Sequence, residues 1–139
     1  MFPMRDTMFQ IGELAKRCQV STDTLRFYEK NALIAPAGRS ESGYRLYDEN
    51  NLKQVSFILK AKALGLSLEE IRELLEIRLD ASEHSCAEAK AITSAKLQVI
   101  DDKIAELTRI RAALQKINDA CCGDIDDDAT HCSILAALE

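Results

Sequence analysis

The fold of this chain is decided by the stretch Phe9-Gln-Ile-Gly-Glu-Leu-Ala-Lys-Arg-Cys-Gln-Val-Ser-Thr-Asp-Thr-Leu-Arg-Phe-Tyr-Glu-Lys30. Apolar residues recur at helical spacing over residues 9–18, and Ser21 can cap a second helix over residues 22–30. Two short helices joined by a tight turn predict a helix-turn-helix, whose second helix can enter the major groove of DNA. The polar and aromatic side chains on that second helix belong to Thr24, Arg26, Phe27, Tyr28 and Lys30.

A turn-rich segment, residues 36–43, comes next, and the aromatic residues 44–47 after it have the composition of a short strand. A loop closed by a strand directly after a helix-turn-helix is typical of a wing. Its candidates for reaching phosphates and the minor groove are Arg39, Tyr44, Arg45 and Tyr47. Either tyrosine can instead pack beneath the wing.

Two further helices complete the N-terminal part. Asp48 or Asn50 can cap a helix that ends at Gly65. A capping box over residues 67–70 then opens another helix through Arg78. Four packed helices with a wing therefore predict a globular head that closes near residue 79.

Residues 86–120 contain neither Gly nor Pro and predict one long helix. Leu97, Ile100, Ile104, Leu107 and Leu114 fall on a seam of alternating steps of three and four, in which Arg111 and Asn118 occupy the two remaining positions. This heptad stripe is the mark of a coiled coil, and a second copy of the chain would cover it. Packing back onto the chain's own head is the alternative. We expect a homodimer.

Composition restricts the class of protein. The chain has 139 residues, of which 47% are hydrophobic, and this suits one compact domain or a small domain with an appendage. No apolar run is long enough to cross a bilayer, and no apolar signal core follows Met1, so we expect a cytoplasmic protein. Basic residues prevail over residues 1–62 and acidic ones over residues 80–139, which suits a nucleic-acid-binding head on a tail with another task.

The five cysteines suit metal ligands or reactive thiols better than a disulfide framework, because their number is odd and the chain lacks a secretion signal. Cys18 fits a small buried residue of the first helix. Cys121, Cys122 and Cys132 bracket one polar loop, and Cys86 stands at the other end of the long helix. In an antiparallel dimer Cys86 would come level with the partner's loop. Clustered thiolates suit Zn(II), and also Cd(II) or Pb(II).

Other donors and other chemistries remain open. His84 and His131 lie beside these cysteines and are further candidate ligands, as is the loop carboxylate of Asp126. Cysteine oxidation could switch the same head without any metal, and buried structural thiols are the plainest alternative. A thiol enzyme would need an oriented nucleophile or an acid/base pair, and the sequence offers neither, so we do not expect an enzyme.

Three motifs resemble the MerR family of transcription regulators: the opening of the helix-turn-helix (residues 9–16), the run of residues 20–29, and Arg39-Ser-Glu-Ser-Gly-Tyr-Arg-Leu-Tyr47. The tail, with Ser85-Cys86, residues 118–123 and residues 132–135, is similar to the zinc-efflux branch of that family.

The resemblance implies a winged-helix homodimer, joined by an antiparallel coiled coil, on a palindromic promoter with an overlong spacer. With metal bound, such a dimer distorts the DNA so that RNA polymerase transcribes a metal efflux or resistance gene. It implies DNA contacts by Arg26, Tyr28, Arg39, Tyr44, Arg45 and Lys62, to which Thr24 is added from its place on the second helix. It implies metal ligation by Cys121, Cys122 and Cys132 together with Cys86 of the other copy.

One position departs from the zinc pattern, which has a His four residues after the second loop cysteine, where this chain has Asp126. Either Asp126 or a neighbour replaces that His, or His131 takes its place, or the metal is Cd(II) or Pb(II) held mainly by thiolates. A linear copper(I) site with two thiolates would leave Cys86 without a role.

The expected organisation is all-α with a small β wing, in four parts. These are a disordered N-terminal extension over residues 1–8, a winged helix-turn-helix DNA-binding domain over residues 9–79, a linker and dimerisation coiled coil over residues 80–120, and a metal-binding loop with a short helix over residues 121–139. Translation could also start at Met8.

Overall fold

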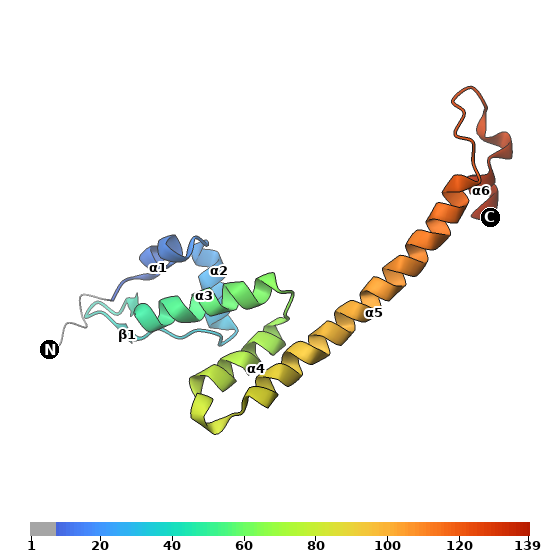
Figure 1. Ribbon diagram of the computed structural model, residues 1–139. Helices are drawn as coiled ribbons and strands as arrows, with labels where there is room; N and C mark the ends of the chain where they lie inside the picture. The colour runs from blue at the N-terminus through green and yellow to red at the C-terminus, as the bar shows by residue number, and fades with distance from the viewer. Residues whose placement is uncertain (1–7) are drawn as a thin grey trace. The chain divides into compact units, whose positions relative to one another are not determined.

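The computed structural model describes residues 8–139, so the extension expected over residues 1–8 lies outside the described residues except for Met8. The chain forms two compact units, one ending at Ile92 and the other running from Thr93 to Glu139. Over residues 8–139 the chain forms helices, one short hairpin and two 3-10 turns (Figure 1). The predicted fold class, mostly helical with a small β wing, is confirmed.

The helix-turn-helix consists of α1 (Ile11–Cys18) and α2 (Thr22–Lys30). Gln19 takes a left-handed conformation, with φ of 59°, and ends α1. Ser21 then caps α2 by accepting a hydrogen bond from the backbone N–H of Thr24 at 3.1 Å. The tight turn is therefore encoded by the residues between the two helices.

The wing is an antiparallel hairpin of β1 (Gly38–Arg39) and β2 (Arg45–Leu46), in which Gly38 pairs with Leu46. Phe9 forms a β-bridge with Tyr47, through N–H···O bonds of 2.8 and 2.7 Å. The first helix was expected over residues 9–18, but it begins at Ile11 because the backbone of Phe9 is extended in this bridge.

Two capping boxes open the next two helices. In α3 (Glu49–Ala63) the side chain of Asp48 accepts from the N–H of Asn51, and the side-chain oxygen of Asn51 accepts from the N–H of Asp48. In α4 (Leu68–Leu79) Ser67 and Glu70 make the same reciprocal pair. A short 3-10 turn, η2 (Ala81–Glu83), follows α4.

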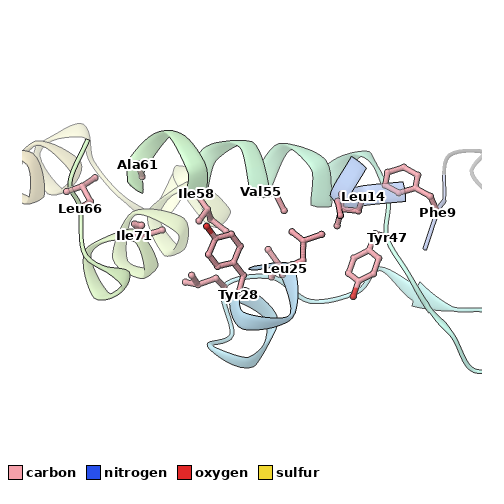
Figure 2. Packing of buried hydrophobic residues seen from close by; sticks show 13 residues of the cluster. Phe9, Leu14, Leu25, Tyr28, Tyr47, Val55, Ile58, Ala61, Leu66 and Ile71 are labelled. Atoms are coloured by element: carbon pink, nitrogen blue, oxygen red, sulfur yellow. The ribbon is translucent and has the colours of Figure 1, made fainter. Parts of the chain in front are cut away.

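The core of the first unit lies between α1, α2, α3 and α4 (Figure 2). Its largest fully buried side chains are Tyr28, Tyr47, Leu14, Leu25, Ile58, Ile71 and Val55. Cys18 is partly buried against this cluster, as expected for a small apolar residue, and burial raises the pKa of its thiol.

Two core tyrosines differ in their hydroxyl groups. Tyr47 donates to the Glu29 carboxylate at 2.6 Å, whereas the buried Tyr28 hydroxyl has no hydrogen-bond partner among the described residues. We expect Tyr28→Phe to leave the free energy of unfolding unchanged or raise it by up to about 1 kcal/mol, because it removes an unpaired buried polar group. Tyr47→Phe should lower it by about 1–2 kcal/mol. Urea unfolding measures the free energy of unfolding of both variants. A larger loss of stability in Tyr28→Phe than in Tyr47→Phe would show that the Tyr28 hydroxyl has a hydrogen-bond partner.

The long helix α5 (Cys86–Asp119) has 34 residues and matches the helix predicted over residues 86–120 to within one residue. Gly123, with φ of 71°, lies just beyond its end. The turn η3 (Ala129–His131) and the helix α6 (Ser133–Ala137) complete the second unit. Within residues 8–139, none of the helices combines the length and the apolar character that crossing a bilayer requires.

The apolar stripe of α5 is uncovered in the single chain. The exposed fractions of its five members run from 37% to 64%, for Leu97, Ile100, Ile104, Leu107 and Leu114. A helix with a regular stripe of exposed leucine and isoleucine needs another surface to bury it.

Candidate functional site

The helix α2 divides its side chains between the core and the solvent. Leu25 and Tyr28 are buried, whereas Arg26, Phe27 and Lys30 are exposed on the outer surface. The guanidinium of Arg26 lies 3.4 Å from the Asp23 carboxylate, an exposed pair that yields easily to a stronger partner such as a phosphate. Thr24, partly buried, shares a 2.9 Å hydrogen bond with the Ser21 hydroxyl.

Tyr28 was expected to contact DNA, and the structure corrects this expectation. Its side chain is only 1% exposed, and it points into the core beside α3 (Figure 2). A side chain that the core encloses cannot reach a duplex, so we assign Tyr28 to packing. Its neighbour Phe27 is not among the contacts predicted from the sequence, yet its side chain is 48% exposed. The signal lay in the helical period, which turns Phe27 outward when Tyr28 faces inward.

Tyr44 and Tyr47 in the wing could each pack in the core or contact DNA, and the structure distinguishes between them. Tyr44 at the wing is 62% exposed, whereas Tyr47 is fully buried. Gly43, with φ of 90°, makes the turn that only glycine adopts readily. Arg39 stiffens this turn by donating from Nη1 to the carbonyl of Gly43 at 2.8 Å.

The helix α2 and the wing together border a shallow hollow of about 540 Å³. It is lined by Gln10, Ile11, Arg26, Glu29, Lys30, Tyr44, Arg45 and Tyr47. Three of these side chains are cationic, and Arg39 and Lys62 are exposed elsewhere on the same unit. This basic hollow suits a polyanion more than an apolar ligand.

The loop after α5 encloses a second hollow, of about 670 Å³, in the other unit. Cys121, Cys122 and Cys132 all line it, and so do Asp126 and His131. The Cys122 thiol points to the Asp127 carboxylate, 3.9 Å from Oδ2. The loop is held by short-range turns, because Asp124 accepts from the Asp126 N–H and Asp128 from the Thr130 N–H, both at 2.9 Å.

The thiol of Cys132 lies beside backbone N–H groups at the start of α6. The backbone N–H groups of Leu135 and Ile134, at the start of α6, lower the pKa of this thiol, and a hydrogen bond with Cys121 lowers it further. A lowered pKa favours the thiolate form of Cys132, which is the form that binds metal ions.

The donors of this loop fit a thiophilic metal ion in their chemistry. Three sulfurs lie in one short segment, one with a lowered pKa, and carboxylate and imidazole donors stand beside them. Across residues 8–139, however, no group of three or more His, Cys, Asp or Glu side chains already converges as a metal site. The loop gathers the donors without closing them around one point.

Cys86 and His84 lie at the other end of α5. Cys86 is exposed and begins the helix. The His84 imidazole contacts the Glu88 carboxylate at 3.0 Å, and this hydrogen bond raises the pKa of His84 and lowers that of Glu88. Cys86 is the first residue of α5, and the loop cysteines follow the last residue of that helix in the sequence.

Comparison with known proteins agrees with these features. A family described as MerR HTH family regulatory protein matches residues 9–77, and one described as MerR, DNA binding matches residues 52–117. The HTH-type transcriptional regulator ZntR of Escherichia coli K12 is 48% identical over 95% of this chain and 93% of its own.

Two solved structures are similar as well. The transcription regulator PbrR691 from Ralstonia metallidurans CH34, in complex with lead(II), matches with 34% identity and a TM-score of 0.83, over 94% of this chain and 99% of its own. HiNmlR, a MerR family regulator bound to promoter DNA, matches with 26% identity and a TM-score of 0.56, over 81% and 84%. The chain therefore belongs to the MerR family of DNA-binding transcription regulators, and not to a family of enzymes.

Proposed function

We propose that this MerR-family regulator is metal-responsive: a homodimer that binds a palindromic promoter with an overlong spacer and activates a metal efflux or resistance gene. The observation that carries the proposal is the loop with three cysteines, in which backbone N–H groups lower the pKa of Cys132. The similarity to ZntR and to PbrR691, which was solved with lead(II), supports the same effector class. Such a protein acts where the promoter lies, in the cytoplasm.

The four parts expected from the sequence are retained in this proposal. Residues 9–79 bind DNA, residues 80–120 link and dimerise, residues 121–139 bind metal, and residues 1–8 precede the domain. The proposed DNA contacts are Thr24, Arg26, Arg39, Tyr44, Arg45 and Lys62. Their partly or fully exposed side chains support this set, and Phe27 joins it because it is exposed on α2. Contacts to the DNA phosphates position the dimer on the duplex, and contacts from α2 to the bases determine which DNA sequence is bound.

The metal site in this proposal joins two subunits. Its ligands are Cys121, Cys122 and Cys132 of one subunit with Cys86 of the other. In the sequence, Cys86 stands at the start of α5 and the three loop cysteines come after its end. An antiparallel pair of such helices brings each Cys86 level with the partner's loop.

Zn(II) is the proposed metal, with Cd(II) and Pb(II) as alternatives. Cys121, Cys122 and Cys132 of one subunit and Cys86 of the other would hold the ion, whose positive charge would offset the repulsion among their thiolates. Asp126 and His131 line the same hollow as the loop cysteines, so either can supply the oxygen or nitrogen that Zn(II) accepts. His84, beside Cys86, is a further candidate. In this account the joined subunits distort the promoter, so that RNA polymerase can engage both of its elements.

Transcription in vitro with purified protein and RNA polymerase tests the proposal. Zn(II), Cd(II), Pb(II), Cu(I) and Hg(II) are compared at equal free concentration, next to an arm with a mild thiol oxidant and no metal. We expect activation by Zn(II), Cd(II) or Pb(II). Activation only by the oxidant would favour the thiol-redox alternative on the same fold and contradict the metal effector.

A further inference from the structure

Glu29, on the inner side of α2, is bonded to the wing by both of its carboxylate oxygens. Oε2 lies 2.8 Å from Nε of Arg45, and Oε1 accepts a hydrogen bond from the Tyr47 hydroxyl at 2.6 Å. Its side chain is only 19% exposed, so solvent screens the pair with Arg45 less than it screens the other ion pairs of α2. One side chain thus ties the DNA-facing helix to the wing.

The geometry of the strand explains why the carboxylate reaches both partners. Arg45 and Tyr47 are two residues apart, and side chains at that spacing leave an extended strand on the same face. The Tyr47 ring is fully buried, and its backbone is paired with Phe9. Burial, followed by the Glu29 bond, raises the pKa of Tyr47 to about 12, so its phenol remains a donor at any physiological pH.

The charge of Glu29 opposes DNA binding, although its position supports it. It lines the same hollow as the cations Arg26, Lys30 and Arg45, where its negative charge weakens the attraction of that surface for phosphate. A carboxylate placed here lowers affinity for every duplex alike. Its two bonds to the wing, by contrast, favour binding only to a duplex that α2 and the wing contact together.

We propose that Glu29 is a positioning residue, which fixes the wing against the recognition helix and thereby gives up general affinity for DNA in favour of preference for the operator. Arg45 is 54% exposed, so it can donate to a phosphate while its Nε stays with Glu29. The inference rests on the proposed DNA interface and adds to it a residue that makes no contact with DNA.

The test measures the dissociation constants of wild type, Glu29→Gln and Glu41→Gln for two probes. One probe is the tightest duplex that the wild-type protein selects from a random library, and the other is a scrambled duplex of the same composition. Glutamine at position 29 keeps an oxygen for Tyr47 but turns an amide N–H₂ toward Arg45, so it removes the ion pair with Arg45. Glu41→Gln, at the exposed end of the wing, removes an equal charge without touching the two bonds.

We expect Glu29→Gln to weaken binding of the selected duplex about tenfold, as for loss of one charge-assisted hydrogen bond. Binding of the scrambled duplex should stay unchanged or tighten. Glu41→Gln should tighten binding of both duplexes by the same factor. It therefore preserves the specificity ratio, which is the dissociation constant for the scrambled duplex divided by that for the selected duplex. A ratio that Glu29→Gln leaves unchanged, or changes only as Glu41→Gln does, would overturn the positioning role.

Tyr47→Phe gives a second readout that does not depend on the charge of Glu29. It removes the hydrogen bond from the Tyr47 hydroxyl to Glu29 and keeps the aromatic ring in the core. We expect the specificity ratio between the scrambled and the selected duplex to fall about threefold. An unchanged ratio in this variant also counts against the role. If the wild-type protein itself binds both probes equally, the proposed DNA function fails and this role with it. A wild-type preference that survives Glu29→Gln overturns this role alone.

Discussion

Metal-induced transcription should be lost in Cys86→Ser, while binding to the operator remains within about twofold of wild type. Cys86 is exposed at the start of α5 and lies outside the described core, so its replacement should not disturb the fold. Serine is a poor substitute for thiolate toward soft metals. Loss of a residue that only supports a metal ligand can lower metal affinity by roughly 100-fold. Because Cys86 is itself a proposed ligand, we expect its replacement to lower metal affinity by at least as much.

The measurement pairs run-off transcription across a metal titration with operator binding by the same preparation. Cys18→Ser is the matched control, because Cys18 is partly buried against the core of the first unit and belongs to no proposed ligand set. Cys18→Ser should keep the metal response. Full induction of Cys86→Ser would remove Cys86 from the site and leave the loop cysteines to act alone.

We expect Leu107→Asp to dissociate the dimer and, with it, to abolish operator binding. Leu107 lies in the apolar stripe of α5, where its side chain is exposed in the single chain. In the dimer each subunit would lose about 2 kcal/mol of burial and force a carboxylate out of water. The dissociation constant of the dimer should rise roughly 1,000-fold or more.

Sedimentation velocity at micromolar concentration measures this change directly. Val99→Asp is the matched control, because Val99 lies on α5, is also exposed and stands outside the heptad stripe. That variant should stay dimeric. A Leu107→Asp protein that remains dimeric and still binds its operator would show that the stripe is not the dimer interface.

Much of the fold follows from local chemistry in the sequence. The caps at Ser21 and Ser67 and the turn at Gly65 fix helix ends to within a residue or two. The start of α1 could not be found in this way, because it depends on the pairing of Phe9 with Tyr47, which are distant in the sequence. Contacts between remote residues leave no periodic signal.

The candidate DNA interface was only partly predictable for the same reason. Helical spacing names the residues of α2 but does not say which face is inside, and so Tyr28 was mistaken for a DNA contact. In the wing, alternation does not decide between Tyr44 and Tyr47 until the strand is packed. The bonds of Glu29 join α2 to β2, and neither segment predicts them alone.

For the cysteine loop, the sequence alone predicts which residues come together. The proximity of Cys121, Cys122 and Cys132 in the sequence predicts that one loop gathers them, and all three line its hollow. The lowered pKa of Cys132 depends on the N–H groups at the start of α6, which a sequence pattern does not orient. The lowered pKa of Cys132 is therefore a property of the folded loop.

The central proposal, that two subunits share each metal site, is tested most directly by a mixed dimer of Cys86→Ser and Cys121→Ser subunits. Two different affinity tags isolate this dimer, and the charge-transfer absorbance of thiolate-bound Cd(II) counts intact sites. If the site is shared, the mixed dimer retains one intact set of ligands, whereas each mutant homodimer has none. We therefore expect half of the wild-type Cd(II) signal from the mixed dimer. A mixed dimer with no more signal than the two homodimers would contradict the shared site.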